Sequence, residues 1–333
     1  MQKKTTFRAR IGGAVAAVVL ATQAAPASAT DILFIGNSFI YSPFISYGGV
    51  GVVDLNGTGY SGIAGLFKTF TEQAGLDYNV SVELRGGSSL QYHYTNKLTQ
   101  IGSSAWDTVV MHDYSTLDSA SPGDPTKLNT YSALLEQYIH GTNADFTNAN
   151  ANPDAEVFLM QTWARADQVY NTPSSPWYGT SLEQMAGDLH DAYYGAAWAN
   201  TEIDGVIPTG DAWLLAVQTG IADRNPYDGI DPGKMDVWGP DHYHQSAFGS
   251  YLEALTIFGK VTGVDPRSLG SNETAATVLG LSPIDAVTAQ VVAYQTLQIA
   301  PVPEPATYAM LFSGLGIVGW VSARRRRRST ETV

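Results

Sequence analysis

The chain has 333 residues, a formal net charge of −13 and no cysteine, which excludes disulfides, thiolate zinc sites and a cysteine nucleophile. Residues 30–300 contain 9 of the 18 basic residues and 29 of the 31 acidic ones, so this central part carries about −20. Nucleic acids and anionic membranes bind basic surfaces, so neither is expected as the main ligand, and a neutral substrate fits better.

Residues 1–29 have the three-part layout of a secretory signal peptide. Basic residues come first, the apolar run 11–20 follows, and the small residues Ala27 and Ala29 precede Thr30. An N-terminal membrane anchor is the alternative, but the apolar run is short for a membrane span. We therefore predict export with removal of residues 1–29.

The central part alternates strand-like and helix-like patterns, which predicts one domain over residues 30–300. Short apolar runs predict strands at 32–36, 79–84, 107–112, 156–161 and, weakly, 205–208. Apolar residues at helical spacing predict helices at 62–75, 128–141, 181–199 and 245–263, and one or two more within 271–300. This order predicts a three-layer α/β/α fold with a mostly parallel five-stranded sheet and its strand carboxyl ends at one edge, where ligands bind in such folds.

Three polar loops interrupt this plan, at 121–127, 163–180 and 222–244. The second and third are rich in aromatic residues, namely Trp163, Tyr170, Trp177, Tyr178, Tyr227 and Trp238. Long loops inside a compact domain are often functional, so these rings could line a sugar or acyl site. Local capping of the core is an equally good interpretation.

The first strand is followed by Gly36, Asn37 and Ser38. A serine in this position often caps a helix. Far downstream, however, Asp241 and His244 stand at the spacing D-x-x-H just before the helix at 245–263. A serine nucleophile needs a base and a group that orients the base, and this short turn could supply both.

These motifs resemble the SGNH/GDSL hydrolase family. "FIGNSF" is similar to its first block with the nucleophilic serine, and "DHYH" to its last block. "LRGGSSL" is similar to its second block, whose glycine amide donates to the oxyanion hole. The resemblance implies Ser38, Asp241 and His244 as catalytic residues, the amides of Ser38 and Gly87 as oxyanion donors with Gly86 as the second choice, and a flavodoxin-like SGNH-hydrolase fold.

One block departs from this family. After the third strand the family carries G-x-N-D, whose asparagine is the third oxyanion donor, whereas this chain reads "VVMHDYSTLD". A subset that resembles carbohydrate esterases also replaces this block. The possible substitutes are His112, Ser115 and Thr116, and spacing does not choose among them.

Other polar residues receive simpler interpretations. His242 is the alternative base, but the D-x-x-H spacing favours His244. His93, in the helix after the Gly87 loop, could reach the site, but a surface or core histidine is the favoured interpretation. His140 and His190 are expected to be structural. The crowded aspartates of the third loop do not match an EF-hand, so a solvated acidic loop is expected, with a loose calcium site as the alternative. These aspartates are Asp223, Asp228, Asp231 and Asp236.

Residues 301–333 resemble a PEP-CTERM sorting signal. Pro303, Glu304 and Pro305 form the motif, the uncharged stretch 306–323 is just long enough to span a membrane, and five arginines follow at 324–328. Because positive residues stay cytoplasmic, residues 30–300, the body of the protein, are predicted to lie outside the inner membrane. The resemblance implies processing by an exosortase and a place in the periplasm, cell envelope or extracellular space.

Together these patterns predict an exported serine esterase that acts on a neutral ester, with O-acetyl groups of polysaccharide as the suggested substrate. No metal or organic cofactor is expected. The alternative is a non-catalytic envelope or matrix protein that binds carbohydrate through a degenerate SGNH fold. The missing G-x-N-D asparagine and the aromatic loops favour this alternative.

Overall fold

A computed structural model describes residues 29–45, 47 and 51–299 of the chain. The predicted signal peptide, apart from Ala29, and the predicted tail with its apolar stretch 306–323 lie outside these residues. Within the described ranges, no helix is long and apolar enough to cross a membrane.

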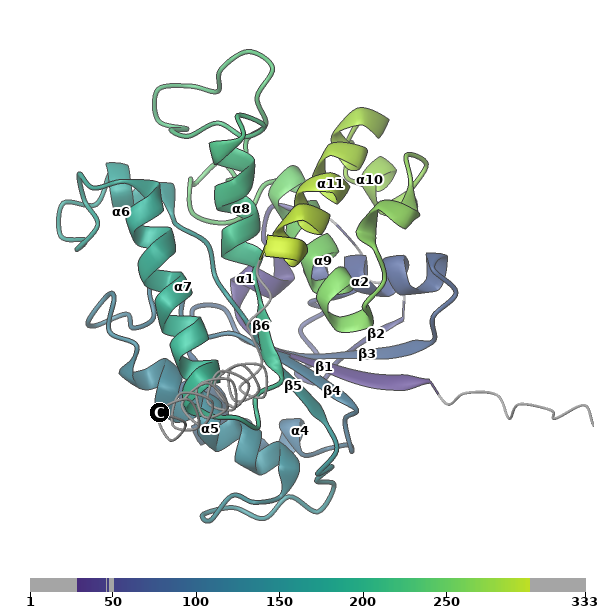
Figure 1. Cartoon of the computed structure of the whole chain (residues 1–333). Helices are drawn as coiled ribbons and strands as arrows, with labels where there is room; N and C mark the ends of the chain where they lie inside the picture. Colours follow the sequence, from purple (N-terminus) through teal and green to yellow (C-terminus); the bar gives the residue numbers. More distant parts are fainter. Residues whose placement is uncertain (1–28, 46, 48–50, 300–333) are drawn as a thin grey trace, which may run out of the picture.

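A single sheet of six parallel strands forms the centre of the molecule (Figure 1). In chain order the strands are β1 (Thr30–Gly36), β2 (Val52–Asp54), β3 (Tyr78–Leu84), β4 (Thr108–Met111), β5 (Glu156–Met160) and β6 (Gly205–Ile207). Their order in the sheet is β2-β3-β1-β4-β5-β6. Strand β1 lies between β3 and β4, and its residues Ile32 to Ile35 are completely buried. The carboxyl ends of β1, β3 and β4 therefore meet at one edge of the sheet.

Helices cover both faces of the sheet, as Figure 1 shows. One group consists of α3 (Leu90–Asn96), α5 (Thr126–His140) and α7 (Leu182–Ala199), in which α5 contacts the other two. The other group packs around α9 and consists of α2 (Gly62–Gln73), α8 (Thr209–Gln218), α9 (Ala247–Thr262), α10 (Thr274–Val278) and α11 (Pro283–Ile299). Short helices complete the fold: α1 (Ser38–Tyr41), α4 (Leu98–Ile101), α6 (Ala166–Tyr170) and the 3₁₀ helix η1 (Pro266–Leu269).

Local chemistry explains where the main helices begin and end. The hydroxyl of Ser181 accepts a hydrogen bond from the Gln184 amide at the start of α7, and Ser246 does the same with Gly249 at the start of α9. Helix α9 ends at Thr262, and the next residue, Gly263, has a φ of +69° and so supplies a left-handed C-terminal cap. Because α9 is almost wholly buried, its first turn gives a rigid base to the preceding segment with Asp241 and His244.

The predicted α/β class and parallel sheet are confirmed, with two additions. Without β2, the strand order is the flavodoxin-like one, in which the first strand lies between the second and third. Strand β2 is a sixth, edge strand that the sequence did not predict, and helix α8 was also missed. Residues 271–300 form two helices, α10 and α11, as one of the expected alternatives.

Candidate active site

Ser38 begins α1 directly after β1, and Asn37 holds the turn between them. The Asn37 side-chain oxygen accepts from the Phe39 amide at 3.1 Å, and its amide group donates to the Ser88 carbonyl at 2.9 Å and the Asp113 carbonyl at 3.4 Å. Asn37 therefore ties the end of β1 to the segments that follow β3 and β4. The Ser38 side chain lies at this junction of three strand ends.

Ser38, His244 and Asp241 form one chain of hydrogen bonds. The distance from Ser38 Oγ to His244 Nε2 is 2.7 Å, and the distance from His244 Nδ1 to Asp241 Oδ2 is also 2.7 Å. The second carboxylate oxygen of Asp241 accepts from the backbone amides of Tyr243 and His244 at 3.1 and 2.9 Å. Three residues that are separated by up to 206 positions are thus brought together by the fold.

A buried glutamine holds the two halves of this chain together. Gln245 Nε2 donates to the Phe39 carbonyl at 2.7 Å, so the residue after His244 is bonded to the residue after Ser38. The Phe39 ring stacks on Trp163 with ring centroids 3.9 Å apart. The side chain that follows Ser38 in the chain is therefore packed in an apolar, aromatic cluster.

The surroundings prepare His244 to accept a proton. Burial lowers the pKa of His244 below its ordinary value, Asp241 opposes that shift, and the positive charge of Arg165 adds to it. Burial alone would raise the pKa of Asp241, but hydrogen bonds from the His244 ring and from two backbone amides outweigh it and lower that pKa. At neutral pH the imidazole is uncharged and the carboxylate is ionised.

Gly86 and Gly87 form a tight turn beside Ser38. The Ser88 amide donates to the Arg85 carbonyl at 3.3 Å across this turn, and Gly87 has a φ of +67°, which glycine adopts without strain. A Cβ atom on Gly86 would lie 2.8 Å from the Tyr41 hydroxyl, so a side chain there would collide. In the described part of the chain, the amides of Ser38 and Gly87 donate no hydrogen bond to other protein groups.

The three candidates for the missing asparagine are engaged elsewhere. His112 Nε2 accepts from the Asn37 amide at 3.2 Å, and its Nδ1 donates to the Asp113 carbonyl at 2.8 Å. Burial lowers the pKa of His112 to about 3, so the ring is neutral. Ser115 accepts from Arg165 Nη1 at 2.9 Å, and Thr116 donates to the Asp118 carbonyl at 3.1 Å.

Arg165 is a feature of this site that the sequence did not reveal. Its guanidinium carbon lies 3.5 Å from the Tyr243 ring centroid. The His244 ring also contacts Tyr243, with ring centroids 3.9 Å apart. Nε and Nη2 of Arg165 both donate to the Asp167 carboxylate, at 2.9 and 2.6 Å. Arg165 lies in the predicted loop 163–180, and nothing in its local sequence indicates that it approaches His244.

The remaining histidines lie outside the Ser38 chain. His242 contacts the Tyr227 ring, with centroids 4.4 Å apart, and has a positive φ of 55°. His140 Nδ1 lies 2.6 Å from Glu136, and His190 Nδ1 lies 2.9 Å from Asp211. His93 is completely buried next to Ser88.

The acidic loop is held by its own hydrogen bonds. Asp223 accepts from the amides of Asn225 and Asp231, and Lys234 pairs with Asp231 at 2.7 Å. Among the described residues, no group of three or more His, Asp or Glu side chains is arranged to hold a metal ion.

The aromatic loops mainly cap the core. Trp163, Trp177 and Trp238 are 0–2% exposed, and Trp163 stacks on Trp213 with centroids 4.2 Å apart. Only Tyr178 and Tyr227 of this set count among the exposed large side chains. The capping interpretation therefore holds for the tryptophans.

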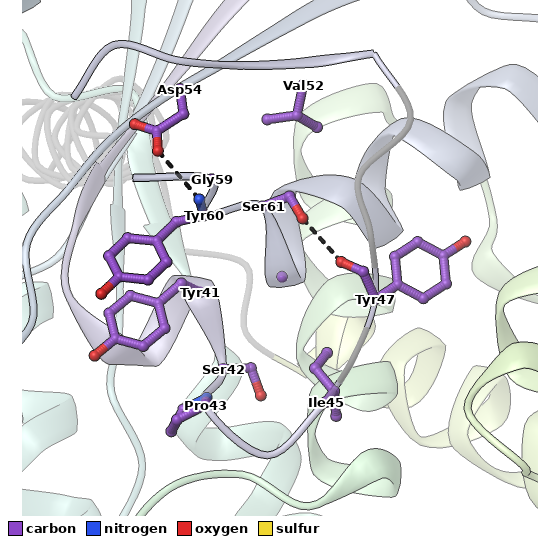
Figure 2. Close-up of a pocket in the computed structure, with 11 residues that line it drawn as sticks. Tyr41, Ser42, Pro43, Ile45, Tyr47, Val52, Asp54, Gly59, Tyr60 and Ser61 are labelled. Carbon is purple, nitrogen blue, oxygen red and sulfur yellow. Dashed lines mark hydrogen bonds between the residues drawn. The ribbon is translucent and has the colours of Figure 1, made fainter. Parts of the chain in front are cut away.

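A cavity of about 840 Å³ lies beside α1 (Figure 2). Figure 2 shows the rings of Tyr41 and Tyr60 stacked at one end of it with their hydroxyl groups pointing the same way; the ring centroids are 4.1 Å apart. Burial is the main reason that the pKa of Tyr41 is raised, and an interaction with the Ser38 side chain opposes this shift. Tyr41 is thus a wall of the cavity and a neighbour of Ser38.

Comparison with known proteins identifies the C-terminal segment and the fold. Residues 301–327 match the PEP-CTERM protein-sorting motif, which confirms the resemblance in the sequence and indicates an exported protein that an exosortase processes at its C-terminus. No curated protein sequence matches the chain.

The fold is similar to that of a DUF4886 family protein from Bacteroides uniformis, with 19% identity, coverage of 84% of this chain and 99% of that chain, and a TM-score of 0.56. A protein classed as a GDSL-like lipase from Parabacteroides merdae gives 15% identity, coverage of 70% and 95%, and a TM-score of 0.49. An acetyl xylan esterase gives 15% identity, coverage of 69% and 99%, and a TM-score of 0.46. At these identities the likeness concerns the fold alone. The chain therefore combines an α/β fold like that of the DUF4886 protein with a PEP-CTERM sorting motif.

Proposed function

We propose that the protein is an exported serine esterase whose nucleophile is Ser38. The observation that carries this proposal is the continuous chain from Asp241 through His244 to Ser38, with 2.7 Å at each step. A serine hydroxyl is a weak nucleophile, and a neutral imidazole within hydrogen-bond reach is what activates it. The lowered pKa of His244 supports its role as the base.

In the proposed reaction, Ser38 Oγ attacks the ester carbonyl carbon while its proton passes to His244 Nε2. The carbonyl oxygen becomes an oxyanion, which the amides of Ser38 and Gly87 stabilise. His244 then gives its proton to the departing alkoxide, which leaves an acyl group on Ser38. Water, with its proton taken by His244, attacks this acyl group. The bond to Ser38 Oγ then breaks, the carboxylic acid leaves, and His244 returns the proton to Ser38 Oγ. Asp241 orients the imidazole and stabilises its charged form throughout.

The substrate class that we propose is an uncharged ester, with O-acetyl groups of polysaccharide as the main candidate. The cavity beside α1 is lined by Tyr41 and Tyr60, aromatic side chains of the kind that sugar rings contact. The side chain of Phe44, 46% exposed, lies against His244 with centroids 6.0 Å apart and provides a second apolar surface. The acidic central part disfavours anionic esters.

We also propose a location and a domain organisation. A signal peptide over residues 1–29 would direct export, residues 30–300 would form the esterase domain, and the segment 306–323 would hold the protein in the inner membrane before processing. The body would then act in the periplasm, the cell envelope or the extracellular space.

A direct test is the reaction of the purified protein with a fluorophosphonate probe and with p-nitrophenyl acetate. We expect labelling of Ser38, and we expect Ser38→Ala to lose both labelling and at least about 1000-fold in kcat. Ser132→Ala is a matched control, because Ser132 is equally buried in α5 but lies outside the site. Equal hydrolysis by the wild type and Ser38→Ala would refute the proposal.

The second candidate, a carbohydrate-binding protein without catalysis, is favoured by one observation. His112 and Ser115, which could replace the asparagine of the oxyanion hole, make other hydrogen bonds. The same probe separates the two functions: absence of labelling, together with retention on acetylated polysaccharide by both the wild type and Ser38→Ala, would favour the binding protein.

A further inference from the structure

A second serine–histidine–carboxylate chain lies buried behind the Gly86–Gly87 turn. Ser88 Oγ is 2.7 Å from His93 Nε2, and His93 Nδ1 contacts the Glu83 carboxylate directly. Ser88 is 6% exposed, and His93 and Glu83 are not exposed at all. Glu83 comes from β3 and His93 from α3, so the chain joins the two elements on either side of the turn.

The Glu83 end of this hydrogen-bonded chain also has partners for its polar atoms. The second oxygen of Glu83 accepts from Asn56 Nδ2 at 2.8 Å, and Asn56 Oδ1 accepts from Lys97 Nζ at 2.7 Å. A buried carboxylate is costly unless its oxygens have such partners. The network therefore extends from a lysine on α4's N-terminal side to the turn beside Ser38, without an unpaired polar atom on Glu83 or His93.

The direction of these hydrogen bonds follows from the chemistry of the atoms. Ser88 Oγ lies 2.7 Å from the Arg85 carbonyl oxygen, which can only accept, so the single hydroxyl proton points to that oxygen. His93 Nε2 then donates to Ser88 Oγ, and because Nδ1 faces the Glu83 carboxylate, the His93–Glu83 pair holds a second proton between these two groups. Ser88 is therefore not a second nucleophile, because its hydroxyl is buried and does not donate to a base.

The chain acts on the residues that flank Gly86 and Gly87. On one side, the Arg85 amide donates to the Gly36 carbonyl at 3.0 Å, and the Arg85 carbonyl accepts from Ser88. On the other side, the Ser88 carbonyl accepts from the Asn37 side chain at 2.9 Å. Ser88 is thus bonded to His93 through its hydroxyl and to the residue before Ser38 through its carbonyl.

We propose that Glu83, His93 and Ser88 form a positioning relay that holds the Gly87 amide at the correct distance from the Ser38 amide. This inference rests on the proposed esterase function, in which both amides stabilise the oxyanion. The three residues touch neither the substrate nor the reacting atoms. They act by fixing a turn that has two glycines and would otherwise be free to move.

The test compares three variants of the full protein with the wild type on p-nitrophenyl acetate. Ser88→Ala removes the hydroxyl, His93→Leu removes both ring nitrogens, and His93→Gln keeps an amide donor near the position of Nε2. Loss of one oxyanion donor costs about 100- to 1000-fold in kcat, so a displaced donor should cost roughly 10-fold or more. We expect that loss in kcat for Ser88→Ala and His93→Leu, with KM within about threefold of the wild type and with partial rescue in His93→Gln.

A matched control separates positioning from stability. His140→Leu breaks a comparable His–Glu pair in α5, His140 with Glu136. His140 Nε2 bonds to the Ala155 carbonyl just before the amino end of β5, whereas Ser38 follows the carboxyl end of β1. It should lower the melting temperature and leave kcat per labelled Ser38 unchanged. The double variant Ser88→Ala/His93→Leu should lose no more kcat than the worse single variant, because both residues belong to one chain.

The outcomes distinguish this inference from the proposed function. Wild-type protein that neither labels with fluorophosphonate nor hydrolyses esters would overturn the function, and the relay's role with it. A different result would overturn the relay alone. In that case the wild type is active, and Ser88→Ala and His93→Leu either keep kcat within about twofold or change only KM. Equal losses of kcat in His140→Leu would also overturn it, because the effect would then reflect general stability.

Discussion

The pKa of His244 is affected by two nearby opposite charges, those of Arg165 and Asp167. Arg165 lowers the pKa of His244 and Asp167 raises it, while burial is the largest cause of the net lowering. In the proposed mechanism, His244 must be neutral to accept a proton from Ser38. The acid limb of kcat/KM, which reports the base in the free enzyme, should therefore lie below the ordinary histidine value of about 6.5.

Substitutions at these two residues should move this limb in opposite directions. Arg165→Met removes the cation and leaves the Asp167 charge, so it should shift the limb to higher pH. Asp167→Asn should shift it to lower pH. The measurement is a pH profile of kcat/KM on p-nitrophenyl acetate, with melting temperatures as the control for folding. Shifts of both variants in the same direction would contradict the assignment.

The sequence indicated the polar chain at the site but not its surroundings. Ser38, Asp241 and His244 were predicted because a serine at a strand end and D-x-x-H before a helix are local patterns. Arg165 and Tyr243 were missed because their contact depends on how the loop at 163–180 packs against the segment before α9, where the Asp167 amide donates to the His242 carbonyl. His93 was interpreted as an ordinary histidine, since its partners Glu83 and Ser88 are defined only by the turn between β3 and α3.

At the level of elements, sequence periodicity predicted the long buried segments and missed the short or irregular ones. Strand β2 has three residues, too few to show alternation, and it is defined by pairing with β3 at the sheet edge. Helix α8 starts at Thr209 without a side-chain cap, and its second residue is Gly210. A Cβ there would lie 2.3 Å from the Thr162 carbonyl oxygen, so tertiary packing rather than helix propensity explains this glycine.

A similar close approach joins α8 to α9 and supports the His244 segment. A Cβ on Gly249 would lie 2.2 Å from the Val237 carbonyl oxygen and 2.7 Å from the Trp213 ring. Gly249→Ala should therefore lower the free energy of unfolding by roughly 1–3 kcal/mol, as overpacking does. Urea denaturation measures this change. An unchanged free energy of unfolding would show that the contact between α8 and α9 can adjust to make room for a methyl group.

Two glycines in α7 provide the control for helix propensity. Nothing lies within 4 Å of a Cβ built on Gly187 or Gly195. Replacing either one by alanine should raise the free energy of unfolding by about 0.5–1 kcal/mol, because alanine loses less backbone entropy in a helix. A rise in the free energy of unfolding for these substitutions and a fall for Gly249→Ala would separate the effect of packing from that of helix propensity.

At the scale of the whole molecule, charge is divided between the body and the ends of the chain. The body has 9 basic and 29 acidic residues, whereas the five arginines at 324–328 lie at the end of the sorting motif. Several of the body's cations are already paired: Arg165 with Asp167, Lys127 with Asp118 and Lys234 with Asp231. The net negative charge of residues 30–300 should thus repel anionic substrates and leave neutral esters unaffected.

Two acetyl esters with the same leaving ring make this effect measurable. 4-Acetoxybenzoate is an anion, and methyl 4-acetoxybenzoate is neutral. At low salt the kcat/KM of the neutral ester should exceed that of the anion by about 10-fold, the lower end of electrostatic effects on encounter rates. The Debye length falls from about 30 Å at 0.01 M salt to about 3 Å at 1 M, so the ratio should shrink as salt is added. Intrinsic reactivity differs between the two esters but does not depend on salt in this way. A cationic acetyl ester should show the reverse trend, and a ratio that is constant with salt would mean that the charge of the body does not reach Ser38.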